Sequence, residues 1–194
     1  MSASAILEQT AYSWYTDSAV NPSKGVTQPA PDKTGAYSWV KAPRYSGAPY
    51  ETGPLARMWM DGSYRNGISV MDRHQARAQE ASKIAHALSG WLDEIVIGAP
   101  VFVALTVPAS GSGVGLVEAP RGALGHWLAV KQGKLSVYQV LTPTCWNCSP
   151  RDASGVAGPL EKALEGTPVS DAERPIEALR VVESYDPCLA CAVH

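Results

Sequence analysis

The clearest periodic pattern in the chain lies between residues 70 and 96. Apolar side chains recur there at spacings of three and four positions, as they do along one face of an amphipathic helix. Charged residues such as Arg77, Glu80 and Lys83 lie largely off this stripe, which consists of Ala81, Ile84, Ala85, Leu88, Trp91, Leu92 and Ile95. We therefore predict one long helix over about residues 70–96, ended by the Gly-Ala-Pro sequence at 98–100.

A strand pattern follows. Residues 126–130 and 135–141 are rich in apolar and aromatic residues and flank Lys131-Gln132-Gly133-Lys134, which predicts a β-hairpin over about residues 126–141. The glycine-rich residues 110–115 (SGSGVG) lack the lysine of a phosphate loop, so we expect a flexible loop leading to a site. Short helices are predicted at 159–164, where a proline stands at the first position, and at about 174–183.

Residues 1–60 lack such periodicity. Prolines interrupt them every few positions, at 22, 29, 31, 43, 49 and 54. A regular helix does not persist through this spacing, so we expect an extended, turn-rich segment that lies on a larger body.

Composition narrows the class of protein. The chain has 194 residues, 45% of them hydrophobic and 18% charged, which is typical of a globular domain. Sixteen basic and eighteen acidic residues give a net charge of -2, so there is no basic surface for nucleic acid. There is no apolar run of membrane-spanning length and the N-terminus does not resemble a signal peptide, so we expect no direct membrane insertion, and export only together with a partner.

The four cysteines form two C-x-x-C pairs, Cys145/Cys148 and Cys188/Cys191, with 39 residues between the pairs. This spacing favours a metal site over a disulfide framework, and taken alone it is compatible with structural zinc. His194 follows Cys191 by three positions, so the chain ends in three soft ligand groups.

The ending, residues 186–194 (DPCLACAVH), resembles the C-terminal signature of the large, catalytic subunit of nickel-iron hydrogenases. Further blocks look like that family's motifs, in its order: residues 41–45 (KAPRY), 53–57 (GPLAR), 72–77 (DRHQAR) and 118–126 (EAPRGALGH). The resemblance implies an α+β chain, the C-terminal part of the mainly helical large-subunit fold, with a buried C-terminus. A zinc-stabilised interaction domain would account for the cysteines and for none of these blocks.

The resemblance also implies metal ligands. Cys188 matches the terminal thiolate on nickel, which takes up the first proton, and Cys191 matches a thiolate that bridges nickel and iron. His194 matches a ligand of a separate structural magnesium or iron ion. The implied cofactor is a nickel-iron centre with carbon monoxide and cyanide on the iron, and no iron-sulfur cluster is expected in this chain.

Four further residues match positions around the metals. Arg121 matches an arginine above the iron, and Asp186 an aspartate that pairs with it. Pro120 and Thr144 match positions beside the diatomic ligands, where the threonine hydroxyl donates to a cyanide nitrogen.

Two departures from the family matter. The family's other two cysteines come from a C-x-x-C near the N-terminus of the large subunit, and Cys145 and Cys148 stand in the wrong block to replace them. We expect these two as free thiols near the site, with another metal or a regulatory disulfide as alternatives.

A complete large subunit is also more than twice as long as this chain, so we expect a split subunit. Residues 1–194 would form its C-terminal segment, extended over 1–60 and metal-binding over 61–194.

The expected function is therefore reversible heterolytic cleavage of molecular hydrogen. The expected partners are an N-terminal piece that carries the other C-x-x-C and an iron-sulfur small subunit. The alternative is a non-catalytic, hydrogenase-derived subunit of a respiratory complex. The expected location is periplasmic, or another extracytoplasmic face, with membrane association through partners; a cytoplasmic location is the alternative.

Overall fold

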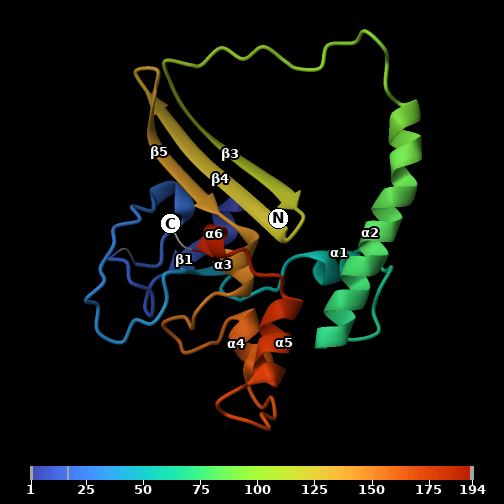
Figure 1. The fold of residues 1–194 in the computed structure, drawn as a ribbon. Helices are drawn as coiled ribbons and strands as arrows, with labels where there is room; N and C mark the ends of the chain where they lie inside the picture. Colours follow the sequence, from blue (N-terminus) through green and yellow to red (C-terminus); the bar gives the residue numbers. More distant parts are fainter. Residues whose placement is uncertain (1, 17, 193–194) are drawn as a thin grey trace.

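The computed structural model describes residues 2–16 and 18–192, and it has an α+β architecture (Figure 1). The N-terminal part contains 3-10 helices η1 (Ala3–Ala5) and η2 (Pro22–Lys24) and strands β1 (Ile6–Gln9) and β2 (Ala42–Tyr45). Helices α1 (Pro54–Met60) and α2 (Val70–Asp93) precede strands β3 (Ser110–Ala119), β4 (Gly122–Lys131) and β5 (Lys134–Leu141). The chain continues with α3 (Pro143–Asn147), α4 (Pro159–Leu164), α5 (Ile176–Ser184) and α6 (Leu189–Ala192).

The central element is an antiparallel sheet in the order β3-β4-β5. The predicted hairpin is confirmed as β4 and β5, with Gly133 at a φ of +71° in the turn. The expected flexible loop at residues 110–115 is wrong, because these residues are the first half of β3 and pair with β4 from Ser110↔Lys131 onward. The regular ladder satisfies their backbone groups, and this pairing outweighs the low strand propensity of glycine.

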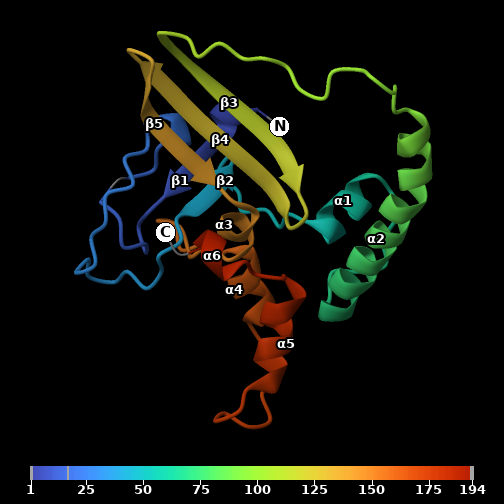
Figure 2. The same ribbon diagram turned by 45° about the horizontal axis from the view of Figure 1, so that its top comes forward.

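The turn-rich N-terminal segment packs on one end of this sheet. Strand β1 pairs antiparallel with β2, which lies next to α3 (Figure 2), and η2 contacts β4 and β5. A buried cluster joins the two parts: Ile6, Val40, Trp127, Leu141, Cys145 and Trp146. Sequence patterns did not indicate α1, whose first turn starts at Pro54 directly after Gly53.

Helix α2 begins with a capping box in which Ser69 and Asp72 bond each other's backbone N–H groups. It ends at Asp93, three residues before the predicted end, where the Glu94 N–H bonds back to Gly90. The predicted apolar stripe is exposed: Leu88 and Trp91 each keep 51% of their surface and Leu92 keeps 66%. Both views show α2 and the linker after it standing apart from the sheet (Figures 1 and 2).

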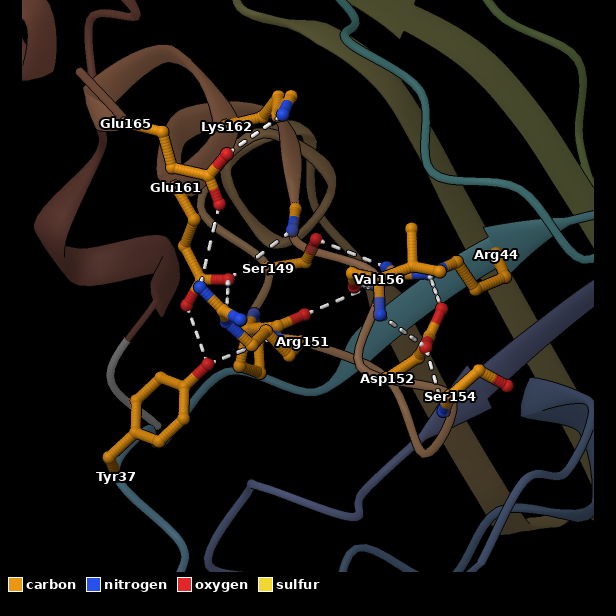
Figure 3. A network of polar contacts seen from close by, with 12 residues as sticks. Tyr37, Arg44, Ser149, Arg151, Asp152, Ser154, Val156, Glu161, Lys162 and Glu165 are labelled. Atoms are coloured by element: carbon orange, nitrogen blue, oxygen red, sulfur yellow. Dashed lines mark hydrogen bonds and ion pairs between the residues drawn. The ribbon is translucent and has the colours of Figure 1, made fainter.

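A buried polar network anchors the loop after α3 (Figure 3). Arg44, fully buried, donates to Asp152 at 2.8 Å and also to the carbonyls of Pro150 and Val156. Burial alone would raise the Asp152 pKa, but the hydrogen bond and charge of Arg44 and the backbone N–H groups of Val156 and Ser154 together outweigh it, so that the pKa lies below its usual range. The network ties β2 to residues 149–156.

In the described residues no helix is both long and apolar enough to cross a bilayer.

Candidate metal centre

Three segments that are far apart in sequence meet at the end of the sheet where β3 turns into β4. The β3–β4 turn carries Pro120 and Arg121, helix α3 carries Thr144, and the segment after α5 carries Asp186, Cys188 and Cys191. Direct contacts join the three segments, as described below. His194 lies outside the described residues, as does the predicted burial of the C-terminal end; the last described helix, α6, has Leu189 at 76% exposure.

Arg121 and Asp186 form an ion pair. The Arg121 Nε lies 3.0 Å from the Asp186 carbonyl oxygen and 3.1 Å from its carboxylate, and a second guanidinium nitrogen lies 3.3 Å from the other carboxylate oxygen. Asp186 has a φ of +49°, in the left-handed region that Asp tolerates better than most residues. Both side chains are 43–44% exposed in this chain.

The backbone of Arg121 is fixed by two glycines packed against each other. A Cβ on Gly53 would lie 2.8 Å from the Arg121 carbonyl oxygen, and one on Gly122 would lie 2.7 Å from the Gly53 nitrogen. Asn147 of α3 completes the contact, since its amide group bonds both the N–H and the carbonyl of Thr52. Helix α3, the 52–53 segment and the β3–β4 turn are therefore held in one arrangement.

The two thiols of the C-terminal pair lie together. A hydrogen bond from the Cys191 thiol lowers the pKa of Cys188, and the nearby Arg121 charge lowers it further. Donating that bond raises the pKa of Cys191. The arrangement favours one thiolate beside a fixed cation, which suits a soft metal ion.

Helix α3 holds both thiol-bearing residues through their backbone. The Cys188 N–H donates to the Thr144 hydroxyl at 3.1 Å, which leaves the hydroxyl hydrogen free to donate elsewhere. The Thr142 hydroxyl lies 3.2 Å from the Cys191 carbonyl oxygen and 3.2 Å from the Cys145 sulfur.

Cys145 and Cys148 are free thiols. Burial raises the pKa of each to about 11, so both are protonated at neutral pH. The Cys145 sulfur lies 3.9 Å from the Cys191 carbonyl oxygen, directly behind the C-terminal pair. A cavity of about 430 Å³ opens beside it, and its walls include Glu8, Lys41 and Cys191.

Among the residues that the structure describes, no three His, Cys, Asp or Glu side chains are placed to hold one metal ion. Sequence reasoning missed Gly53, Asn147 and Thr142 as parts of the site. Gly53 stood in a quoted block, but no sequence signal connected it with Arg121.

Comparisons with known proteins identify the family to which this chain is similar. The family model described as "Nickel-dependent hydrogenase" matches residues 1–67 and 60–194. The chain is 41% identical to the periplasmic [NiFeSe] hydrogenase large subunit of Desulfomicrobium baculatum, covering 97% of this chain and 42% of that protein. It is 36% identical to the hydrogenase-2 large chain of Escherichia coli (strain K12), covering 97% of this chain and 40% of the other.

Solved structures give the same result. The reduced Ni-Fe-Se hydrogenase from D. vulgaris Hildenborough matches with a TM-score of 0.94 and 42% identity, over 100% of this chain and 46% of that one. The chain thus spans less than half the length of these relatives.

Proposed function

Because this chain belongs to the nickel-dependent hydrogenase family, we propose that it is the C-terminal part of a hydrogenase large subunit and supplies half of the thiolates of a nickel-iron centre. The proposed reaction is the reversible heterolytic cleavage of molecular hydrogen. One observation carries the proposal: Cys188 and Cys191 lie together beside the Arg121–Asp186 ion pair, on two distant segments that meet next to helix α3.

The residues present fit such a centre. Cys188 would hold nickel and Cys191 would bridge nickel and iron, because thiolates bind these soft metals strongly. The centre, when bound, supplies the Lewis acidity and redox chemistry for splitting dihydrogen. Cys188, the thiol with the lowered pKa, would accept the first proton.

The surrounding residues would stabilise charge. Arg121 places a cation next to the thiols, and its field strengthens once water is excluded. Asp186 orients that guanidinium through both its carbonyl and its carboxylate. Thr144 has a hydroxyl hydrogen available for a cyanide nitrogen, and Pro120 would line the same side.

We also propose a separate structural magnesium or iron ion held by His194. The cavity beside Cys191 has the buried carboxylate residue Glu8 in its wall, which supports a site near the chain's end.

The site requires the rest of a large subunit, which would carry the other C-x-x-C. Helix α2 and its linker expose apolar side chains that include Ile84, Leu88, Trp91, Leu92, Ile95, Val101, Phe102, Val103 and Leu105. The solved relative matches this chain over its whole length, and more than half of the relative's own chain lies outside the match. We propose that the part of the large subunit corresponding to this remainder packs against the apolar stripe of α2. Leu88→Asp should therefore weaken association with it, whereas Gln79→Asp, at an exposed polar position of the same helix, should not.

The further partner would be an iron-sulfur small subunit that carries electrons to or from the centre. One relative is named a periplasmic hydrogenase, which supports a location outside the cytoplasm. Any membrane association would come through partners.

Infrared spectroscopy of the purified complex tests the function. It should show bands of iron-bound carbon monoxide and cyanide. A complex that contains nickel and iron but lacks these bands would refute the proposal and favour a non-catalytic subunit.

A further inference from the structure

Two sequence blocks, residues 53–57 and 72–77, contribute no proposed metal ligand, yet both place arginines next to the site. Arg57 of α1 contacts the residues directly before Arg121, and Arg73 and Arg77 of α2 contact the residues directly before Asp186. We propose that these three arginines are positioning residues that set the geometry of the Arg121–Asp186 ion pair. The role rests on the function proposed above.

Arg57 holds the strand end that leads into Arg121. Its guanidinium donates to the Ala119 carbonyl at 3.0 Å and to the Pro120 carbonyl at 2.9 Å. Two bonds of 2.6 and 2.7 Å to Glu80 of α2 fix the guanidinium itself, and Glu118 adds a third carboxylate contact at 2.8 Å. A planar fork with five donors can bind two successive carbonyls and a carboxylate at once, which a lysine cannot.

Arg73 and Arg77 hold the end of α5. Arg73 is 6% exposed and bonds both carboxylate oxygens of Glu51 at 2.8 Å. It also donates to the Tyr185 hydroxyl at 2.6 Å, and that hydroxyl donates onward to the Pro159 carbonyl at 3.1 Å. Arg77 donates to the Ser184 carbonyl at 2.7 Å.

These contacts matter because Asp186 follows immediately with a left-handed backbone. Such a conformation persists when its surroundings over-determine it. With Ser184 and Tyr185 fixed on one side and the Cys188 N–H fixed to Thr144 on the other, Asp186 has little freedom to relax. Its carbonyl therefore stays aimed at Arg121.

A purely structural role is the competing explanation, and Arg44 offers a matched control. It is fully buried and bonds a carboxylate and several carbonyls, and its hydrogen bonds go to none of the residues directly before Arg121 or Asp186. The experiment compares Arg57→Lys, Arg73→Lys and Tyr185→Phe with Arg44→Lys in the assembled complex. It measures Tm, metal content, the cyanide infrared bands and the rate of hydrogen–deuterium exchange on dihydrogen.

The three site variants should shift the cyanide bands and lower the exchange rate on the order of 100-fold at unchanged metal content, as expected for a small misplacement of a catalytic group. Arg44→Lys should lower Tm and leave the bands in place. If Arg73→Lys does not assemble, Tyr185→Phe decides, because it removes one hydroxyl and leaves the Arg73–Glu51 pair.

The proposal would be overturned if the site variants kept the cyanide bands in place and exchanged hydrogen within about twofold of the rate of the unaltered complex. If the unaltered complex shows no cyanide bands, the proposed function fails instead. Crystal structures of the same variants then test the positioning role alone. The distance from Arg121 Nε to the Asp186 carbonyl, 3.0 Å here, should lengthen beyond hydrogen bonding in the site variants and stay unchanged in Arg44→Lys.

Discussion

Replacing Gly53 by alanine should displace Arg121 without touching any proposed ligand. Gly53 has a φ of +116° and a ψ of -162°, a region that is essentially restricted to glycine and costs other residues on the order of 1–3 kcal/mol. The new methyl group would lie 2.8 Å from the Arg121 carbonyl oxygen, closer than such atoms approach in proteins. Relief requires the β3–β4 turn to move by about half an ångström or more, which is enough to weaken the 3.0 Å bond between Arg121 and Asp186.

The assay compares hydrogen oxidation, metal content and Tm of the assembled complex with those of Gly62→Ala. Gly62 also has a positive φ, +83°, but a Cβ there would meet nothing within 4 Å. We expect Gly62→Ala to cost about 1 kcal/mol of stability and no activity. Gly53→Ala should lose at least tenfold in activity, on the scale expected for misplaced catalytic groups. Equal activity in the two variants would refute the steric coupling of Gly53 to Arg121.

Three further outcomes are expected. Arg121→Lys keeps the charge but loses the planar fork, so hydrogen oxidation should fall sharply while nickel and iron content, measured by elemental analysis, stays the same. Asp152→Asn should lower the free energy of unfolding by about 3–5 kcal/mol in denaturant titrations, because it leaves the buried Arg44 unpaired, whereas Asp171→Asn in an exposed pair should cost less than about 1 kcal/mol. The raised pKa of Cys148 makes its thiol ionise in the unfolded state near pH 9 and in the folded state only near pH 11. Stability should therefore fall as the pH rises through this window, and Cys148→Ala should remove about 2 kcal/mol of that loss.

Local sequence signals were sufficient where an element is decided by its own residues. The hairpin followed from a turn that contains Gly133, and the start of α2 lies beside a Ser69–Asp72 capping box. Local signals failed for β3, because its alternating glycines are typical of a flexible loop. The strand forms because its ten residues pair with β4. Strand pairing is a long-range term that propensity cannot report.

The site shows the same division. Cys188 and Cys191 are neighbours in sequence, so their proximity follows from local spacing. Arg121 and Asp186 are 65 positions apart, and only the resemblance to a family linked them. The close approach of Gly53 to Arg121 appeared in neither the spacing nor the resemblance, because it depends on how two loops pack.

The proposed remainder of the large subunit would account for both the exposed stripe on α2 and the half-exposed ion pair. A helical apolar stripe indicates that some surface covers it, but it does not say which chain provides that surface. In this chain the Arg121–Asp186 pair is 43–44% exposed, and a pair so exposed contributes no more than about 1 kcal/mol because water screens it. The proposed remainder of the large subunit would exclude that water and strengthen the field of Arg121 at the thiols. Arg121→Gln should therefore scarcely change the thermal stability of this chain by itself, and it should lower the stability of the assembled complex markedly. Equal shifts in both samples would show that covering the site does not create its electrostatics.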